Sequence, residues 1–293
     1  MKFKSDNSFS NSTFKLINLE NKIFLRKFLK SVTKRSFDSL EKQNNFKPQK
    51  LNEFDIISAK IKTSYKDIKK KKYYDMHFYY GKSGDEILKS SNVKEIILLR
   101  NWISNSFFSN KIYNFYRLDP NVYIIKLDEI IKKIKNNSYL KNFLKIHIPQ
   151  FKKMVKKKKI FYPQNKLCHG DLTLSNIIID YSKKKLILID FLKTYNENIV
   201  QDYAKLYQEF KLGWSGRHLG SIKNTRSSII CENIINNNQW NELDIRLKKA
   251  IIIETYMTLF RILPYLNPSD ENTLKWILTS FKKLNKSIKS NNL

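Results

Sequence analysis

The sequence predicts an α+β fold in which a small, mainly antiparallel β lobe is followed by a larger, mainly helical lobe. Short runs of β-branched and aromatic residues, separated by polar turns, fill the first part of the chain. Beyond them the apolar residues recur with the period of a helix. The change falls at a glycine-containing turn, Gly81-Lys82-Ser83-Gly84. We therefore expect domains at residues 1–81 and 82–293.

The small lobe is predicted to contain five strands, at residues 1–4, 14–18, 22–28, 54–61 and 73–80, and a short helix at 36–43. Only Leu19, Glu20 and Asn21 separate the second strand from the third, which predicts a β-hairpin. Ser36 is a residue type that caps the start of a helix.

The large lobe is predicted to contain helices at residues 93–107, 127–134, 139–155, 199–207, 242–266 and 274–288. Pro149 is expected to interrupt the third helix, because proline lacks the N–H that a helix interior needs. Residues 208–240 are polar and irregular.

Residues 167–192 predict a hairpin with oxygen-bearing side chains at its open end. Apolar strands at 177–179 and 186–189 flank a lysine turn at 183–185. Since a hairpin brings its open ends together, Asp171 and Asn176 should lie near Asp190. Carboxylate and amide oxygens, with no thiol or paired histidine, suit Mg²⁺, which can be held by one carboxylate. The other carboxylate can then orient a nucleophile. The alternative is a hairpin with a solvated aspartate at each end.

The same residues resemble the catalytic loop and metal strand of kinase-like phosphotransferases. His169-Gly170-Asp171-Leu172, the Asn five residues after Asp171, and Ile189-Asp190-Phe191 carry the resemblance. Gly170 stands where protein kinases have Arg, and Leu192 stands where they have Gly. Thr173 stands where protein kinases usually have Lys. These departures are similar to the aminoglycoside phosphotransferase and choline kinase group.

The resemblance implies a two-lobed, protein-kinase-like fold and transfer of the ATP γ-phosphate to a hydroxyl group. Asp171 would be the catalytic residue, and Asn176 and Asp190 would hold Mg²⁺. Asp202, near the start of the helix at 199–207, matches an aspartate that bonds loop backbone in the family. An aspartate there would also stabilise the helix by capping.

Nucleotide contacts follow from the resemblance in the small lobe. Alternation in strand 22–28 places Ile23, Leu25 and Lys27 on one face, and a buried lysine is costly unless it meets an anion. The family has its phosphate-binding lysine on this strand, so Lys27 is the candidate, with Arg26 and Lys30 as alternatives.

Other nucleotide contacts are less sharply defined. Glu41 could pair with Lys27, Gln43 could take its place, and an exposed Glu41 is the alternative. The expected phosphate-covering loop, residues 8–13, contains no glycine, which makes close backbone approach harder. Its candidate contacts are Ser10 and Ser12. Residues 74–81 resemble the last small-lobe strand of the family and the hinge that follows it, whose backbone binds the adenine. There Met76 would flank the adenine and Phe78 would contribute backbone contacts.

Composition limits the partners. The 293 residues include 56 Lys and Arg against 26 Asp and Glu, a formal net charge of +30. The abundance of Lys, Asn, Ile, Phe and Tyr favours a compositional origin for this charge, and the lysine runs at 69–72 and 156–159 are expected to be solvated. Neither run is interleaved with aromatics, so no specific nucleic-acid site is predicted. The two cysteines indicate neither a disulfide nor a metal site.

No run of 18 apolar residues and no apolar leader are present, so we expect a cytoplasmic protein, with peripheral membrane contact and oligomeric state left open. The predicted function is ATP- and Mg²⁺-dependent phosphorylation of a small-molecule hydroxyl. A sugar or glycan precursor is favoured by similarity to phosphotransferases associated with bacterial surface-polysaccharide synthesis. An amino alcohol is the other choice, and Trp214, Arg217, His218 and Tyr265 are candidate contacts or packing residues. The alternative function is a nucleotide-binding pseudoenzyme or interaction module with a basic docking surface.

Overall fold

The computed structural model describes residues 2–4, 13–90, 93–108, 114–134, 140–157, 159–164, 168–219, 237–267 and 269–290. Packing divides the chain into two compact units. The first contains Met1–Glu95 and Leu174–Lys193, and the second contains Ile96–Thr173 and Thr194–Leu293. Each unit is thus built from two separate stretches of chain. The expected domains, residues 1–81 and 82–293, are each one continuous stretch of chain, and this boundary stays a prediction.

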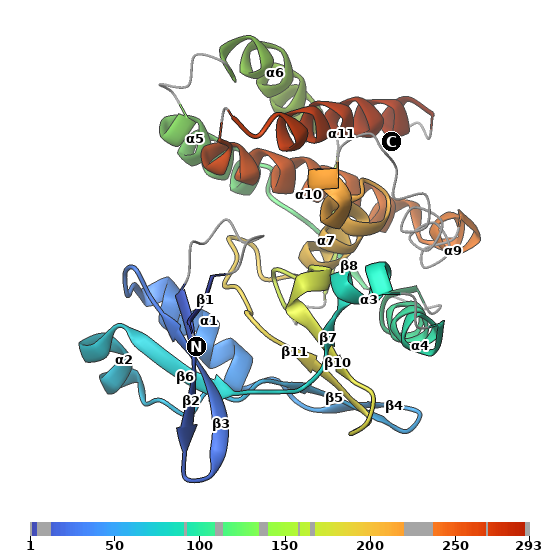
Figure 1. The fold of residues 1–293 in the computed structure, drawn as a ribbon. Helices are drawn as coiled ribbons and strands as arrows, with labels where there is room; N and C mark the ends of the chain where they lie inside the picture. Colours follow the sequence, from blue (N-terminus) through green and yellow to red (C-terminus); the bar gives the residue numbers. More distant parts are fainter. Residues whose placement is uncertain are drawn as a thin grey trace. The chain divides into compact units, whose positions relative to one another are not determined.

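The first sheet of the first unit is antiparallel throughout. Its order is β1 (Lys2–Lys4), β2 (Thr13–Leu19), β3 (Lys22–Phe28) and β6 (Tyr73–His77) (Figure 1). The predicted β2–β3 hairpin is confirmed. Its turn residues Glu20 and Asn21 have φ angles of 52° and 59°. Two left-handed residues in succession match the right-handed twist of the flanking strands.

The second sheet of this unit joins distant parts of the sequence. Its order is β4 (Gln49–Leu51), β5 (Phe54–Ser58), β11 (Lys185–Leu188), β10 (Ile177–Asp180) and β7 (Lys82–Ser83). The predicted β10–β11 hairpin is confirmed, with its turn at residues 181–184. β11 pairs with β5 in parallel, and the other pairs are antiparallel.

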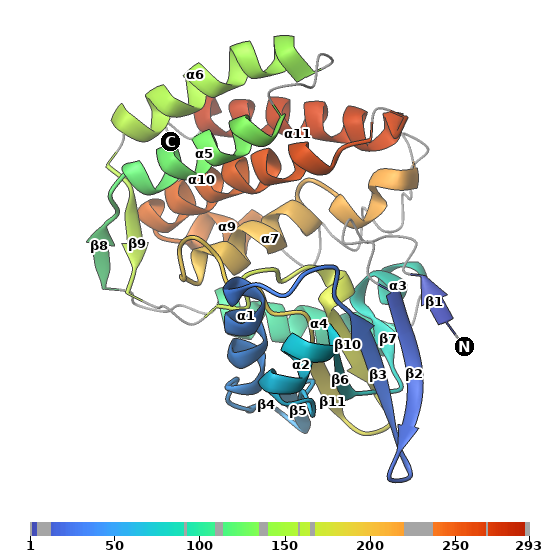
Figure 2. The ribbon, with the colours of Figure 1, turned by 90° about the vertical axis from the view of Figure 1, so that its left-hand side faces the viewer.

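Two helices supply the core beside these sheets. α1 (Lys34–Asn44) starts two residues earlier than predicted, since Thr33 is its N-cap and forms a capping box with Ser36. α2 (Tyr65–Lys71) was not predicted. The helices lie side by side (Figure 2), with the rings of Phe37 and Tyr65 5.6 Å apart in edge contact. The core cluster they share with the strands comprises Leu40, Ala59, Ile61, Ile68, Tyr74, Met76 and Ile187.

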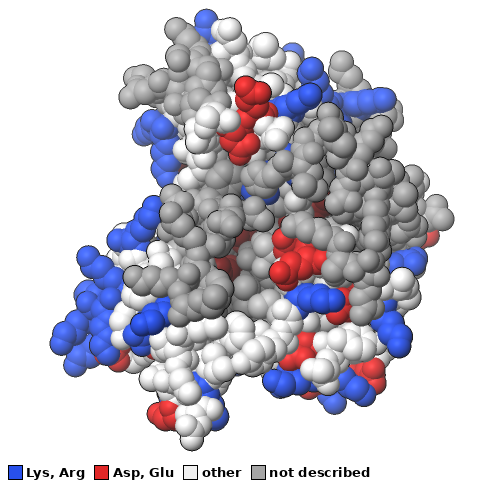
Figure 3. All heavy atoms as spheres, viewed as in Figure 1, with Lys and Arg blue, Asp and Glu red and all other residues white. Residues whose placement is uncertain are grey.

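The lysine run at 69–72 belongs to α2. Lys69, Lys70 and Lys71 form its last turn, and Lys72 is a left-handed C-cap. All four are exposed, as predicted. Figure 3 shows Lys and Arg side chains gathered where Figure 1 labels α2. Cations at this end also complement the helix dipole.

The glycines at the change of periodicity are explained by close packing. A Cβ on Gly81 would lie 2.6 Å from the carbonyl oxygen of Ile179, and one on Gly84 would lie 2.8 Å from that of Leu174. At these two positions, just before β7 and at the start of α3 (Gly84–Ser90), the backbone therefore approaches the segment around β10 too closely for any side chain.

The second unit is mainly helical. It contains most of α4 (Val93–Ile103), which crosses the boundary, together with α5 (Asn121–Ile134), α6 (Lys141–Lys157), α7 (Val200–Phe210), α9 (Asn237–Glu242), α10 (Ile245–Ile262) and α11 (Glu271–Ser290). A small sheet of β8 (Phe115–Arg117) and β9 (Phe161–Pro163) was not predicted. α10 is buried along most of its length and contacts α5, α7, α11 and β9. The predicted α+β class is confirmed.

One expectation about this unit was wrong. Pro149 lies inside α6 and does not interrupt it. Pro149 and Lys145 are both exposed, so water can bond the Lys145 carbonyl that loses its helical partner. Among the described helices, none is both long enough and apolar enough to cross a membrane.

Candidate active site

The β10–β11 hairpin places Asn176 and Asp190 at its same open end. Ile177 pairs with Leu188 in the ladder, and the N–H of Ile189 donates to the carbonyl of Asn176 at 3.1 Å. Asn176 thus lies just before β10, and Asp190 lies just after β11. Both belong to the first unit.

The backbone of Asp190 is left-handed, with a φ of 56°. The chain after it is anchored, since the N–H of Phe191 donates to Gln43 Oε1 at 3.4 Å and Gln43 Nε2 donates to the Ala59 carbonyl at 2.6 Å. Non-glycine residues in this conformation are uncommon and cluster at functional sites. The buried Gln43 therefore helps to fix where the Asp190 carboxylate leaves the strand.

Lys27 reaches Asp190 across 163 residues of sequence. Its Nζ lies 2.6 Å from Asp190 Oδ2, and the Tyr74 hydroxyl donates to Oδ1 at 3.4 Å. The Lys27 side chain is 12% exposed and that of Asp190 is 28% exposed. Burial by itself lowers the pKa of Lys27, but Asp190 and Tyr74 outweigh it and hold that pKa above its ordinary value. The ammonium group is therefore charged.

The register of β3 explains why Lys27 points this way. Lys27 lies opposite Tyr74, and Leu25 lies opposite Met76, so both face the core cluster, as the alternation predicted. Ile23, which was expected on this face, is 37% exposed at the end of the strand.

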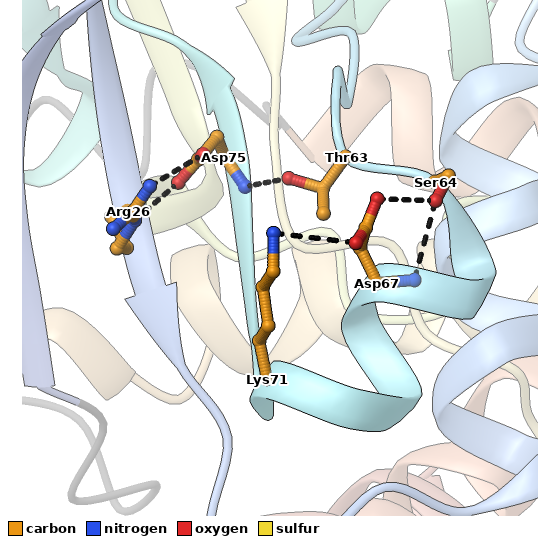
Figure 4. Close-up of polar contacts among 6 residues, drawn as sticks. All are labelled: Arg26, Thr63, Ser64, Asp67, Lys71 and Asp75. Carbon is orange, nitrogen blue, oxygen red and sulfur yellow. Dashed lines mark hydrogen bonds and ion pairs between the residues drawn. The ribbon is translucent and has the colours of Figure 1, made fainter.

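Arg26 lies on the opposite face of β3 and is engaged elsewhere. Its guanidinium donates to both carboxylate oxygens of Asp75, at 2.8 Å and 3.0 Å (Figure 4). The guanidinium also stacks over the ring of Tyr73, 3.8 Å from the ring centre. The N–H of Asp75 donates to Thr63 Oγ1. Lys30 is exposed beyond the strand. Of the three cations considered for the nucleotide, Lys27 is the one that meets Asp190.

For the other residues expected to contact the nucleotide, the structure shows no comparable contact with Lys27 or Asp190 among the described residues. Glu41 is exposed on α1, and an ion pair with Lys27 is not among those found in the described residues. Met76 is buried in the core cluster. Phe78 follows β6, and its N–H donates to the Ile23 carbonyl at 3.2 Å. Ser10 and Ser12 lie outside the described residues. The nucleotide roles of these residues stay predictions.

The donor set at the hairpin end fits a hard cation. Asp190 offers carboxylate oxygens and Asn176 an amide oxygen. Within the described ranges, no group of three or more His, Cys, Asp or Glu side chains could hold a metal. Mg²⁺ is commonly held by one or two carboxylates together with water and phosphate oxygens. These two side chains therefore fit a metal whose shell a nucleotide would complete.

In the second unit, α7 braces the loop that carries Asp171. The carboxylate of Asp202 accepts from the N–H of His169 at 2.6 Å and from that of Gly170 at 2.7 Å. Gly170 has a φ of 87°, which favours glycine. The predicted loop-bonding role of Asp202 is confirmed. Its capping role is not, because Ile199 is the N-cap residue and makes no side-chain cap bond.

Asp171 forms an ion pair that sequence reasoning missed. Lys205 Nζ lies 2.9 Å from Asp171 Oδ1, and the two side chains are 11% and 33% exposed. Burial raises the pKa of Asp171, but Lys205, with smaller contributions from Arg261 and His169, brings it below its ordinary value. The position of Lys205 could have indicated this pair. Lys205 lies three residues after Asp202, the loop-bonding aspartate, in a helix whose other residues are buried.

A second missed feature is a buried glutamate surrounded by phenols. The hydroxyls of Tyr123, Tyr162 and Tyr195 donate to Glu254 of α10, at 3.1, 2.9 and 2.6 Å. The hydroxyls of Tyr123 and Tyr162 also contact each other. Burial raises the pKa of Glu254 above its ordinary value. This cluster ties α5, β9 and the segment after Lys193 to α10.

The candidate acceptor contacts are placed differently from one another. Arg217 is buried, and its guanidinium lies 3.7 Å from the ring centre of Trp214. Trp214 also packs on Trp276, with 5.0 Å between ring centres. Tyr265 is exposed. The side chain of His218 lies outside the described residues. The contacts of Trp214 and Arg217 account for both residues as packing residues, and their acceptor roles stay predictions.

One of the solved structures to which the chain is similar has the same fold. The choline kinase from Cryptosporidium parvum Iowa II matches with a TM-score of 0.54 at 11% sequence identity, over 100% of this chain and 90% of the kinase. The chain has a choline kinase-like fold. Plasmodium vivax ethanolamine kinase matches with a TM-score of 0.45 at 13% identity, over 91% of this chain and 81% of that chain. A spectinomycin phosphotransferase solved with ADP and spectinomycin matches with a TM-score of 0.37 at 14% identity, over 98% and 88%.

The fold assignment rests on the first of these structures and confirms the expected kinase-like fold. No family profile matches the sequence, and no curated protein does. The similarity to phosphotransferases of surface-polysaccharide synthesis stays a prediction.

Proposed function

We propose that the protein is an ATP-dependent phosphotransferase that moves the γ-phosphate to a hydroxyl of a small molecule. The observation that carries this proposal is the meeting of Lys27 with Asp190 at the hairpin end where Asn176 also lies. A charged ammonium that contacts a carboxylate, at the hairpin end that also carries an amide oxygen, is a chemical match for a nucleotide phosphate with its metal.

The proposed roles follow from these groups. Lys27 would bind phosphate oxygens, and Asn176 and Asp190 would bind Mg²⁺. The metal, when bound, would neutralise charge on the phosphates. Asp171 would accept a hydrogen bond from the acceptor hydroxyl and orient its oxygen. Phosphoryl transfer needs mainly positioning and charge neutralisation, so this small set is sufficient.

The chemical class of the phosphate acceptor is also part of the proposal. A sugar or glycan precursor and an amino alcohol are the two candidates. An amino alcohol such as choline would need acidic and aromatic groups around its cation. The second candidate function, a nucleotide-binding module without turnover, is favoured by one observation, the absence of glycine from residues 8–13.

A thermal-shift titration followed by an acceptor screen tests the proposal. The protein is melted with Mg²⁺ alone, with ATP and EDTA, and with Mg²⁺ and ATP. A ligand at 100 times its Kd stabilises a fold by about 2.7 kcal/mol, which should raise the Tm by several degrees. The same samples are then screened for ADP release with sugars, glycan precursors, amino alcohols and aminoglycosides.

The outcomes separate the two functions. Stabilisation that needs Mg²⁺ and ATP together, with ADP release on one class of acceptor, supports the phosphotransferase. Stabilisation without ADP release on any acceptor favours the binding module. An unchanged Tm at millimolar Mg²⁺ and ATP contradicts both.

A further inference from the structure

We propose that Lys205 is a positioning residue of the transfer reaction, whose ammonium holds the Asp171 carboxylate ionised and oriented for the acceptor hydroxyl. The inference rests on the proposed function and adds a residue that the sequence motif does not contain. It starts from an ion pair inside the second unit, where Lys205 Nζ lies 2.9 Å from Asp171 Oδ1.

The burial of the two partners is unequal in an informative way. Every residue of α7 other than Lys205 is buried, and the Lys205 side chain itself is only 11% exposed. An ammonium in such a position is costly unless an anion compensates it. Asp171, by contrast, is 33% exposed, so a solute can reach its carboxylate while Lys205 holds one oxygen from the protein side.

The same face of α7 makes two separate contacts with the loop. Asp202 bonds the loop backbone at His169 and Gly170, and Lys205, three residues later, bonds the side chain of Asp171. Residues three apart are neighbours on a helix surface. Because Asp202 holds the backbone without help from Lys205, the loop should keep its path when Lys205 is replaced. What changes is the charge and direction of one carboxylate.

The surrounding charges reinforce this role. Among the described residues, the charges of Lys205 on α7, Arg261 on α10 and His169 in its own loop lower the pKa of Asp171. Asp202 on α7 bonds that same loop. The cations keep the pKa of Asp171 below its ordinary value despite burial. Such a carboxylate is a weak base that is fully ionised at neutral pH. It is suited to accept and direct a hydrogen bond.

Asp171 would serve the transfer of the γ-phosphate to the acceptor hydroxyl. The acceptor oxygen bonds to the γ-phosphorus while the bond from that phosphorus to the ADP oxygen breaks, and its electron pair leaves with ADP. The hydroxyl proton is released through Asp171 to solvent late in the transfer. Lys205 takes no part in bond making and acts through Asp171.

The first measurement reads the carboxylate directly. The ¹³C carboxylate signal of Asp171, assigned by its loss in Asp171→Asn, is titrated in the wild type, Lys205→Met and Lys205→Arg. The matched control is Lys152→Met, which removes an ion pair of 2.8 Å with Asp128 in the same unit. We expect the midpoint to rise in Lys205→Met and to stay near the wild-type value in the other two variants.

The second measurement is the rate of ADP release from Mg²⁺-ATP, to the acceptor found in the screen or to water. Misplacing a reacting group can lower a rate by roughly 100-fold. We therefore expect kcat to fall by up to roughly 100-fold in Lys205→Met, with the acid limb of its pH profile moved upward and the KM for ATP little changed. Lys205→Arg should recover most of the rate, and Lys152→Met should match the wild type.

Several results would overturn the inference. One is an Asp171 midpoint in Lys205→Met equal to that of the wild type. Another is a shifted midpoint with kcat no lower than in Lys152→Met. If Lys205→Met fails to fold, the double variant Asp171→Asn/Lys205→Met decides, because it removes the uncompensated carboxylate. A double variant that also fails to fold contradicts the pairing, and one that folds supports it and leaves Lys205→Arg to carry the kinetics.

Failure of the proposed function would look different. A wild type that binds Mg²⁺ and ATP but releases no ADP with any acceptor or with water contradicts the transferase, and the kinetic role of Lys205 with it. The carboxylate titration would still report whether Lys205 keeps Asp171 ionised.

Discussion

Replacement of Lys27 by methionine, with Arg26→Met as the matched control, separates nucleotide binding from stability. The two residues are neighbours on β3, and each makes an ion pair on its own face of the strand. Both pairs are partly buried, between the exposed pairs that contribute about 0.2–1 kcal/mol and the buried pairs whose disruption costs about 3–5 kcal/mol. We expect each variant to lose about 1–3 kcal/mol of unfolding free energy.

Arg26→Met should be the less stable of the two. It leaves Asp75, whose side chain is 9% exposed, without its bidentate partner. It also removes the stacking of Arg26 on Tyr73, a type of contact that contributes about 0.5–1 kcal/mol. If stability alone controlled nucleotide binding, Arg26→Met would therefore bind ATP no better than Lys27→Met.

The expected order of ATP affinity is the reverse. Hydrogen bonds to charged groups contribute about 1.5–3 kcal/mol, so Lys27→Met should raise the Kd for Mg²⁺-ATP by roughly 10- to 150-fold. Arg26→Met should change it by less than about twofold. Because the pKa of Lys27 is held above its ordinary value, the difference should be the same from about pH 6 to pH 9.

Calorimetric titration with Mg²⁺-ATP, beside urea unfolding of the same preparations, measures both quantities. Equal losses of affinity in the two variants would refute the reasoning, and so would a larger loss in Arg26→Met. Either result would mean that the face of β3 toward Tyr74 and Met76 is not the nucleotide face.

Three further predictions concern single carboxylates. Asp190→Ala should make ATP affinity the same with Mg²⁺ and with EDTA, because the metal loses its carboxylate ligand; a persistent Mg²⁺ dependence by calorimetry would argue against this ligand. Asp171→Asn keeps the shape of the side chain, so we expect turnover to fall by about 10²–10⁴-fold with ATP affinity little changed, as followed by ADP release and titration of a folded sample. Burial raises the pKa of Glu254, so the folded state holds this proton more tightly than the unfolded chain does. That contribution is complete below the ordinary glutamate pKa and is lost as pH rises through the raised value, so wild-type stability relative to Glu254→Gln should decline from about pH 4 upward. Urea unfolding at several pH values would detect it, and a constant difference would contradict the raised pKa.

Local patterns in the sequence predicted much of the fold. The period-two alternation of β3 placed Lys27 on the core-facing side, and the polar turns gave both hairpins. α2 was missed because a lysine run such as 69–72 is equally typical of a solvated loop and of the end of a helix. The capping signature Ser64-x-x-Asp67 was available as a signal, and the structure shows Ser64 accepting from the N–H of Asp67.

Features that depend on long-range pairing could not be predicted in this way. Nothing in the composition of β11 shows that its partner is β5, more than a hundred residues earlier, because strand periodicity defines a face and no neighbour. For the same reason the roles of Lys205 and of the tyrosines around Glu254 were not predicted, because these roles depend on contacts with side chains from other elements. Asp190 was predicted from its spacing, whereas its left-handed backbone was not.

The composition of the first unit from two stretches has a consequence for synthesis of the protein. β11 and β10 lie between β5 and β7 in the second sheet, but they belong to Leu174–Lys193. When Met1–Glu95 has left the ribosome, β5 still has an unpaired edge, and roughly a hundred more residues must be added before it is covered. At about 5–20 residues per second the wait is about 5–20 s. A nascent chain with an open strand edge is prone to aggregation, so it should depend on chaperones at this stage, and a fragment ending at residue 95 should not fold alone.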